Sequence, residues 1–280
     1  MRRTLLLTAI AVTLAVSAQK KADIEVSYDY HYPTSNRIDN MRLLGNSEGS
    51  AYFNNSSLWL DSLLSTPGGK AKYNEIVNTF TTVENGYKVI SMPNDYIKTI
   101  HTYIFNNPAE NMLTVYDNWS ENQGYYTEPY SEQVWEIVPD STCNILNYEC
   151  ILAESDYHGR HWKAWFTPEI PMQYGPWKLH GLPGLILKAE APGGFMFIAT
   201  GLASTTRNVP TMFMSDKYTK VSRLKILKED EQIRNNQASM MAASSNNKVK
   251  ITYHDENGNV VEPPKYDGLI ENLEPDYKQK

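Results

Sequence analysis

The sequence predicts a mainly β protein of the α+β class: a curved antiparallel sheet or half-open barrel with a C-terminal helix packed on it. Three observations lead to this fold class. Strand-forming runs recur along most of the 280 residues, turn residues separate these runs at intervals too short for crossover helices, and one amphipathic segment follows the last run. Long hairpins followed by a single helix match the element order of a half-open barrel.

The first elements follow from local patterns. Residues 24–32 alternate apolar and polar side chains, which is the period of a half-buried strand, and the run stops at Pro33. Residues 41–45 and 51–53 are two further short strand candidates. Ser57 is placed to cap a short helix that runs to Leu64, whereas residues 73–80 fit either a helix or a strand.

Strand-forming segments become dense after residue 87. Turn residues such as Asn106-Asn107-Pro108 and Pro192-Gly193-Gly194 separate them. We expect strands at 87–90, 97–105, 112–116, 133–138, 148–154, 161–167, 185–189 and 195–201. A partial helical stripe over 216–243 predicts one helix on the sheet, and a weak hairpin over 249–261 precedes a loose polar tail.

The N-terminus has the pattern of a secretory signal peptide. Arg2 and Arg3 precede an apolar run from Leu5 to Val16, and small residues end at Ala18 before the expected cut. The run of about a dozen residues is shorter than the ~20 that span a bilayer, and no other window approaches a membrane span. We therefore expect a signal peptide at 1–18, one β-rich domain at 19–245, a hairpin and tail at 246–280, and a periplasmic or extracellular mature protein without a transmembrane span.

Charge argues against one class of partner. The chain has 26 Lys and Arg against 32 Asp and Glu, a formal net charge of −6, and loss of Arg2 and Arg3 with the signal would make the mature chain more acidic still. Binding to nucleic acid needs a clustered positive surface. The sequence therefore predicts no nucleic-acid partner.

The segment from Trp135 to Gly201 carries the most specific sequence pattern. It holds Gly159-Arg160, then Trp165-Phe-Thr-Pro, then Ile170-Pro171 and Gly175-Pro176-Trp177, and it ends in the hexapeptide Gly181-Leu182-Pro183-Gly184-Leu185-Ile186. In motif, order and spacing, this segment resembles the GLPGLI family of secreted proteins from Bacteroidetes-type bacteria. The resemblance implies an envelope protein of unknown function, to whose motif no activity is assigned, and often a gene near outer-membrane transport genes.

The residue types in the motif favour a structural role over a catalytic one. The residue before a proline is held extended, so Ile170-Pro171 continues away from the preceding strand. Glycines permit unusual backbone angles and prolines fix others. We therefore expect Gly181 to Gly184 to form a tight turn that leads into a buried strand from Leu185. Asn147, which stands where the family commonly has glycine, also tolerates a left-handed turn.

Cys143 and Cys150 are the only two thiols. They lie across an expected turn between two strands, so we predict a disulfide between them in an oxidising compartment. The alternative, a nucleophilic cysteine with a histidine base, has no supporting spacing. His158 and His161 are the nearest approach to a metal-binding pair, but a tetrahedral site needs further ligands. We expect no metal, no cofactor and no catalytic residue, since the common hydrolase and nucleotide motifs are absent.

Aromatic residues crowd into the central third of the chain. Tyr and Trp suit binding clefts as well as cross-strand packing. We expect ligand contacts from Trp119, Tyr126, Trp135, Trp165 and Trp177. The function that follows is a non-enzymatic envelope protein that binds an apolar, peptide or glycan ligand, or an outer-membrane partner. Two alternatives stay open: a structural or chaperone-like accessory of an outer-membrane transport system, and a hydrolase with its site on loops.

Overall fold

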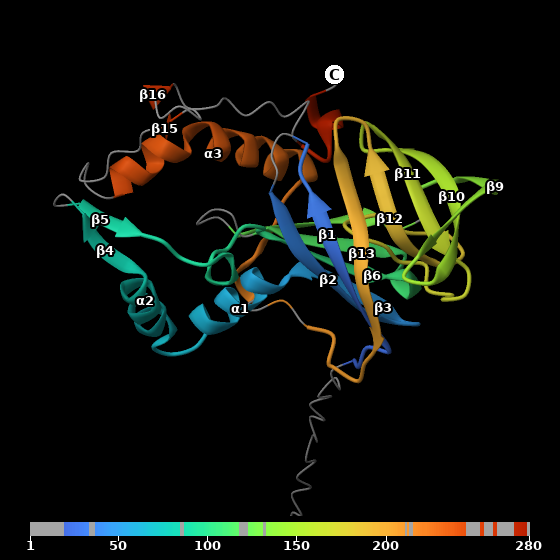
Figure 1. Ribbon diagram of the computed structural model, residues 1–280, viewed down its shortest axis with the longest axis horizontal. Coiled ribbons are helices and arrows are strands. Elements are labelled where there is room, and N and C mark those ends of the chain that lie inside the picture. The colour runs from blue at the N-terminus through green and yellow to red at the C-terminus, as the bar shows by residue number, and fades with distance from the viewer. Residues whose placement is uncertain are drawn as a thin grey trace, which may run out of the picture.

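A computed structural model describes residues 20–33, 37–84, 87–117, 123–130, 133–210, 212, 215–244, 253–254, 260–261 and 272–278. A twelve-stranded sheet dominates these residues (Figure 1). Its spatial order is β14-β8-β7-β6-β3-β2-β1-β13-β12-β11-β10-β9, and every neighbouring pair is antiparallel except β14 with β8. The end strands β14 and β9 do not pair with each other, so the sheet is curved but not closed, as the sequence predicted.

The strands have the following bounds: β1 (Ile24–His31), β2 (Ile38–Asn46), β3 (Gly49–Asn54), β6 (Thr102–Asn107), β7 (Met112–Asp117), β8 (Gly124–Pro129), β9 (Glu136–Ile145), β10 (Tyr148–Tyr157), β11 (Arg160–Thr167), β12 (Leu185–Ala191), β13 (Phe195–Ser204) and β14 (Thr219–Lys220). Pairing shifts by one residue at Ser27/Tyr28 and at Trp165/Phe166, and by three residues at Ile151/Leu152. Irregularities of this kind bend a strand and increase its twist, which lets the sheet curl round a core.

The inner face of the sheet forms the main core. Every second residue of β1 is buried, from Ile24 through Val26 and Tyr28 to Tyr30, as the alternation predicts. Trp162 of β11 and Phe197 of β13 stack against one another in the same core. Tyr28 ties two distant segments together, because its hydroxyl donates a hydrogen bond to the carbonyl oxygen of Ile186 at 2.7 Å.

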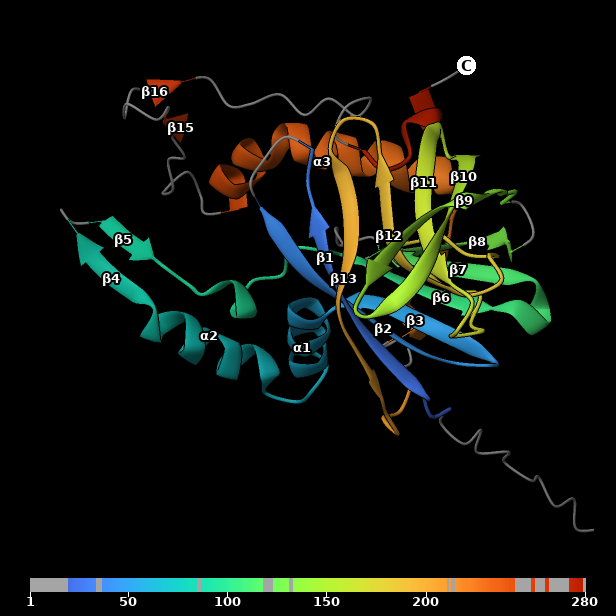
Figure 2. The ribbon, with the colours of Figure 1, turned by 45° about the vertical axis from the view of Figure 1, so that its right-hand side comes forward.

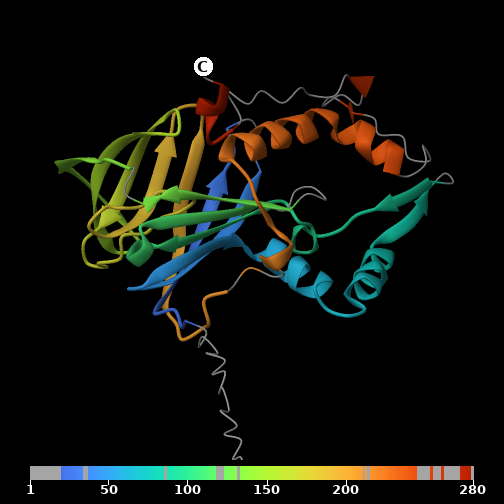
Figure 3. The ribbon, with the colours of Figure 1, turned by 180° about the vertical axis from the view of Figure 1, so that it is seen from behind.

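An arm of four elements projects from β3. It consists of α1 (Asn55–Leu64), α2 (Gly69–Thr79) and the hairpin of β4 (Thr81–Glu84) and β5 (Tyr87–Ile90), and it extends away from the large sheet in Figures 1 and 3. The predicted cap of α1 is wrong by three residues: Asn54 is the N-cap, and its side chain accepts a hydrogen bond from the backbone N–H of Ser57. Asn is at least as good a cap as Ser. Residues 73–80, which fitted helix or strand, belong mainly to α2.

The C-terminal helix, α3 (Arg223–Ser244), lies across one end of the sheet above β6, β7 and β8 (Figures 2 and 3). Its first turns bury Ile226 and Leu227, while residues 228–236 are polar or charged except for Ile233. Further on, β15 (Tyr253–His254) pairs with β16 (Val260–Val261) within the segment where a hairpin was expected. In the described part of the chain, none of the helices combines the length and the apolar character of a membrane span.

Residues 272–278 differ from the loose tail that the sequence predicted. Asn272, Glu274, Pro275 and Tyr277 are buried, and a short 3-10 helix (Pro275–Lys278) ends the segment. Ion pairs with residues far away in the sequence hold it in place, and such pairs leave no local periodicity for a sequence pattern to show. We call residues 272–278 the C-terminal strap.

Candidate functional site

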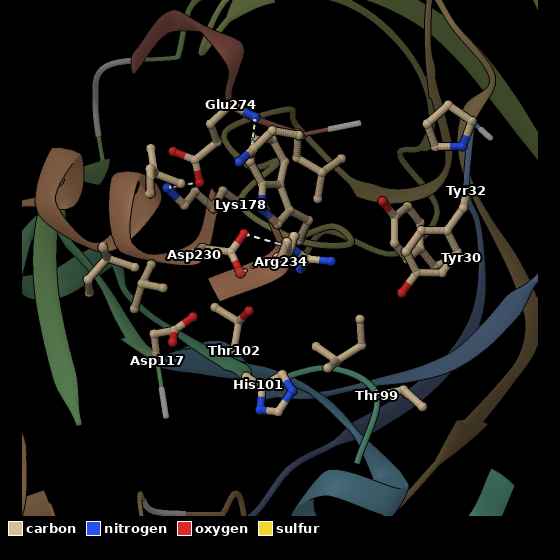
Figure 4. Close-up of a pocket in the computed structure, with 18 of the residues that line it drawn as sticks. Tyr30, Tyr32, Thr99, His101, Thr102, Asp117, Lys178, Asp230, Arg234 and Glu274 are labelled. Carbon is tan, nitrogen blue, oxygen red and sulfur yellow. Dashed lines mark hydrogen bonds and ion pairs between the residues drawn. The ribbon is translucent and has the colours of Figure 1, made fainter. Parts of the chain in front are cut away.

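A cavity of about 170 Å³ lies between α3 and the concave side of the sheet (Figure 4). The floor comes from strands that sequence alternation turns inward: Tyr30 of β1, Thr102 of β6, Asp117 of β7 and Tyr126 of β8. Tyr32, which follows β1, lines one side of the cavity, and its hydroxyl donates a hydrogen bond to Asp39. β1 and the later strands β6, β7 and β8 thus contribute to one concave surface.

The roof of the cavity is the inward side of α3. Ile226 and Leu227 supply apolar contacts, and Asp230 and Arg234, one helical turn apart, point a charged pair toward the floor (Figure 4). Arg234 Nε lies 2.9 Å from Asp230 Oδ2. The helix therefore presents both a hydrogen-bond donor and an acceptor to anything that occupies the cavity.

The charges that line the cavity balance. Arg37, Lys178 and Arg234 are cationic, and Asp117, Asp230 and Glu274 are anionic. His101 adds no charge near neutral pH, since burial, and then the fields of Lys98, Arg234 and Arg37, lower its pKa to about 2. A site with this balance favours an uncharged polar ligand over an ion, because any net charge would face equal numbers of like and opposite groups.

The remaining wall brings the motif region and the C-terminal strap together. Trp177 and Lys178 precede the hexapeptide, and Asn272, Leu273 and Glu274 belong to the strap. Lys178 has a side-chain exposure of only 1%. Its amino group lies 4.8 Å from the centre of the Tyr126 ring and 5.6 Å from that of Trp177, so two aromatic faces share the cation.

Lys178 also belongs to a buried charged cluster behind this wall. Its Nζ lies 2.8 Å from Glu128 Oε2 and 2.6 Å from Glu274 Oε1. Arg223, at the start of α3, places Nε 2.5 Å from Glu274 Oε2, and its Nη2 donates to Asp276. We use "charged cluster" for the group of Glu128, His158, Lys178, Arg223, Glu274 and Asp276.

His158 completes the charge balance of the cluster. Its Nε2 lies 3.2 Å from Glu128, and its Nδ1 lies 3.5 Å from Asp276. Burial alone would lower the pKa of His158, but hydrogen bonds with Asp276 and Glu128 outweigh burial and raise it above the ordinary histidine value. Burial likewise opposes the charge on Glu128, yet Lys178 and His158 lower the pKa of Glu128 to about 2. Three cations then face three carboxylates.

The cluster includes a set of groups with metal-ligating atoms. Single atoms of Glu128, His158 and Glu274 all lie within 4.8 Å of one another. Lys178 and Arg223 already lie at ion-pair distance from both carboxylates, however, so a metal ion there would have to share them with two fixed positive charges. The arrangement works as a charge-balanced link between five segments of the chain.

The aromatic residues that the sequence nominated for ligand binding separate into groups. Tyr126 and Trp177 line the cavity. Trp135 instead fastens the motif region, because its indole N–H donates to the carbonyl oxygen of His180 at 2.7 Å. Trp165 is half-buried on the face of β11 opposite Trp162, and Lys188 lies 4.3 Å over its ring. Trp119 lies outside the described residues.

The hexapeptide from Gly181 to Ile186 forms a corner that leads into β12. Gly181 has φ +88°, and the backbone N–H of Gly184 donates to Leu182 at 2.8 Å. Leu182, Leu185 and Ile186 are buried. None of the six lines the cavity, but the preceding residues Trp177 and Lys178 do, so the corner positions the wall of the site.

The two cysteines face each other. Cys143 of β9 and Cys150 of β10 are directly opposite in the antiparallel register, as free thiols. Asn147, in the turn between these strands, has φ +66°, the left-handed geometry expected for it. The two cysteines therefore have the cross-strand placement that the predicted disulfide needs, while the bond itself stays a prediction.

Sequence reasoning missed Lys178, Arg223 and the acidic partners of both. The partners lie far apart in the sequence, so no spacing could pair them. One local signal was available: a lysine between Trp177 and Leu179 in a run rich in Gly and Pro interrupts an otherwise apolar stretch, and a buried charge needs a partner.

One family model matches a short part of the chain. The model, described as a protein of unknown function (Porph_ging), matches residues 152–188, which contain β11, the corner and the start of β12. No curated protein sequence matches the chain. The matched residues lie within the segment that carries the GLPGLI resemblance and include the hexapeptide, without the GLPGLI name.

Several solved structures resemble the chain. One structure of PNGF-II aligns with 74% of this chain at 15% identity and a TM-score of 0.50, and a second aligns with 73% at 14% identity and 0.48. In both cases the match covers 32% of the PNGF-II chain, so this chain spans about a third of that protein's length. A Pseudomonas aeruginosa MucA/MucB complex aligns with 70% of this chain and 55% of that chain, at 8% identity and a TM-score of 0.31. The resemblance to PNGF-II is a resemblance of fold.

Proposed function

We propose that the protein is a secreted, non-enzymatic binding protein of the cell envelope, and that its ligand is an uncharged polar group such as a sugar unit or a peptide segment. The cavity between α3 and the sheet carries this proposal. Its lining combines aromatic faces, from Tyr30, Tyr32 and Trp177, with equal numbers of carboxylates and cationic side chains. Aromatic surface beside such hydrogen-bonding groups suits a ligand that has both apolar faces and polar edges.

The volume and the charged lining of the cavity distinguish between the ligand classes that the sequence left open. A cavity of about 170 Å³ lies below the ~300–1,000 Å³ typical of drug-sized ligand sites. An acyl chain would also desolvate Asp117, Asp230 and Arg234 without giving them partners, which costs free energy. Glycan and peptide ligands therefore fit better than an apolar one, and the cavity would hold one unit of a longer molecule.

The experiment that tests this proposal removes the charged pair on the roof. A double variant, Asp230→Ala with Arg234→Ala, keeps the net charge but deletes the donor and acceptor that face the cavity. Array screening of envelope glycans and peptides identifies a ligand, and calorimetry then measures its affinity. We expect the double variant to bind the ligand about tenfold more weakly or worse, because it loses hydrogen bonds to charged groups.

A matched control lies on the same helix. Lys225 and Glu229 form an exposed ion pair at 3.7 Å, also one turn apart, and neither lines the cavity. Lys225→Ala with Glu229→Ala should leave binding unchanged. Equal affinity of both double variants would contradict the cavity as the binding site.

A second candidate function rests on the arm. Val83 of β4 is 70% exposed and Ile90 of β5 is 55% exposed, in a hairpin that extends away from the large sheet (Figure 1). Exposed apolar residues on a projecting hairpin suit contact with another protein, in line with an accessory of an outer-membrane assembly. Val83→Ser with Ile90→Ser should abolish partner capture but leave ligand binding intact, whereas the roof variant should do the reverse.

A further inference from the structure

The C-terminal strap forms part of the cavity wall and is seated on a turn that accommodates it. Gly159, between β10 and β11, has φ +81°, and a β-carbon there would come within 2.8 Å of the backbone nitrogen of Asp276. The next residue, Arg160, donates from Nε to the carbonyl oxygen of Asn272 at 2.9 Å. Because any larger residue at 159 would collide with the strap, this turn is shaped for the strap's backbone.

The strap also fastens the roof to the rest of the molecule. At one end of α3, Arg223 contacts Glu274 and Asp276. Two turns later, Glu231 accepts a hydrogen bond from Tyr277 at 2.9 Å and lies 2.6 Å from Lys278 Nζ. The strap thus links α3 to the β10–β11 turn and to Lys178, so the roof and one wall of the cavity share the same fastening.

The bonds that hold the strap are of a kind that can break without disturbing the sheet. No strand of the sheet pairs with the strap in the described structure. Side-chain ion pairs and hydrogen bonds hold it instead, together with the burial of Leu273, Pro275 and Tyr277. Segments held by few backbone hydrogen bonds open with less free energy than the global unfolding of a domain.

We propose that the strap is a displaceable segment whose departure opens the cavity, and that its seat recognises a short acidic peptide. The seat consists of Gly159, Arg160, His158, Lys178 and Arg223. Without Glu274 and Asp276, Glu128 is the one acid among the described residues at ion-pair distance from His158, Lys178 and Arg223, so the vacated seat attracts carboxylates. The chain's own residues 272–278 are the resting occupant, and the spacing of their two acids defines the ligand class.

The first test measures opening in the full chain, with no ligand. Lys178 is buried behind the strap, so an acetylating N-hydroxysuccinimide ester reaches its amino group only when the strap leaves. We expect Asp276→Asn, which weakens the contacts with Arg223 and His158, to raise the acetylation rate of Lys178 about tenfold or more. Peptide mapping by mass spectrometry gives the rate, and Lys188, half-buried beside Trp165, is the internal reference whose rate should not change.

Hydrogen exchange separates strap opening from unfolding. In Asp276→Asn, the exchange rate of the amides of residues 272–278 should rise by the same factor as the acetylation rate of Lys178. The amides of β1 and β13 should keep their wild-type exchange rates. Glu229→Gln, which removes an acid from the outer side of α3, is the matched control and should change neither. Acetylation of Lys178 that rises only in step with exchange in β1 and β13 would overturn the proposal, because the lysine would then be exposed by global unfolding.

The second test asks whether the seat accepts the peptide from outside. A synthetic, end-blocked Asn-Leu-Glu-Pro-Asp-Tyr-Lys is added to the full-length Asp276→Asn protein at about 10 mM, above the millimolar effective concentration typical of a tethered segment. We expect exchange at residues 272–278 of the chain to rise further, while Lys178 becomes protected again by the bound peptide. A peptide with Gln and Asn in place of its acids should do neither. Equal effects of both peptides would contradict recognition by charge.

This inference rests on the proposed function in one respect: opening matters biologically if the cavity binds a ligand. The two can fail separately. Strap opening with no ligand found for the cavity would leave the displaceable strap standing and refute the binding role. A ligand that binds equally fast to wild type and to Asp276→Asn, with Lys178 unreactive in both, would refute the strap and retain the binding role.

Discussion

The backbone carbonyl oxygen of Thr167 lies where a side chain at position 184 would have to be. A β-carbon built on Gly184 would come within 2.1 Å of that oxygen and within 3.0 Å of the α-carbon of Pro168. The end of β11 and the start of β12 therefore approach so closely that only glycine fits between them, and this approach sets the path of the corner that carries Trp177 and Lys178.

Gly184→Ala should destabilise the fold by about 2–3 kcal/mol or prevent folding, because neither backbone at the contact can move aside cheaply. The midpoint of urea unfolding gives the change. Gly201→Ala is the control: its nearest neighbour would be Ser27 Oγ at 3.5 Å, an ordinary contact, and we expect a change below about 1 kcal/mol. Similar losses for both would show that the corner is not tightly fitted.

Lys178→Met should cost about 3–5 kcal/mol of unfolding free energy. Methionine has a similar stem but no charge, so Glu128 and Glu274 would face one another in a buried setting without their shared cation. Lys188→Met removes a lysine of the same length that pairs with Glu190 near the surface at 2.8 Å, and should cost under about 1 kcal/mol. Thermal or chemical unfolding of the two variants, measured side by side, gives both losses of unfolding free energy. Equal losses would contradict the role of Lys178 as the shared cation.

The charged cluster should stabilise the fold most at mildly acidic pH. The folded-state pKa of His158 is raised, so its contribution is fully present below the unfolded value of about 6.5 and is lost as pH rises through the folded pKa. The pKa of Glu128 falls to about 2, so its contribution is present above the unfolded value of about 4.5 and is lost as pH falls. The lowered pKa of His101 acts separately, because it costs stability as pH falls below about 6.5. Calorimetry from pH 3 to 9 should therefore compare the melting temperature of wild type with that of a cluster variant.

His158→Asn supplies the control for that profile. Without the imidazole, the loss of stability above pH 6.5 should flatten, while the loss at acidic pH remains. The same change in melting temperature between pH 6.5 and pH 9 in His158→Asn and in wild type would contradict the charge balance described for the cluster.

Cys143 and Cys150 should form a disulfide when a disulfide reagent such as oxidised glutathione is added. Their cross-strand placement suits the bond, but burial and the neighbouring Cys143 raise the pKa of Cys150 to about 12, so we expect slow oxidation by air alone. Intact mass should fall by two hydrogens on oxidation, and the oxidised protein should gain about 2 kcal/mol. Cys143→Ser should show neither change; a wild-type mass that stays at the reduced value would contradict the prediction.

Local sequence patterns predicted most of the sheet and less of the site. Alternation in β1 and the turn chemistry at Asn147 and Gly193 place strands and hairpins because each signal lies within a few residues. β8 was missed: Gly124 and Pro129 bound a run of only six residues, and its Glu128 is buried by partners on other segments. Glu128, Lys178 and Glu274 come together only through the curvature of the sheet and the docking of the C-terminal strap, and these contacts between distant segments leave no local pattern in a single sequence.

Aromatic density located the right region but not the right side chains. Tyr126 and Trp177 reach the cavity, whereas Trp165 lies on the other face of β11. Trp162, Ala164 and Phe166 are buried, so simple alternation along β11 places Trp165 on the opposite face. The number of aromatic residues in a segment does not distinguish the two faces of a strand.

The place of β1 in the sheet sets the order in which the chain can fold. Although β1 precedes the other strands of this sheet in the sequence, it lies in the interior of the sheet, with β2 on one side and β13 on the other, and Ile24 pairs with Ser204. Until residue 204 is free to fold, one edge of β1 has no partner, and a pairing between such distant segments is slow. The protein therefore cannot complete its core while it emerges from the ribosome or a translocation channel, and its unfinished edge is the point at which aggregation or a chaperone would compete with folding.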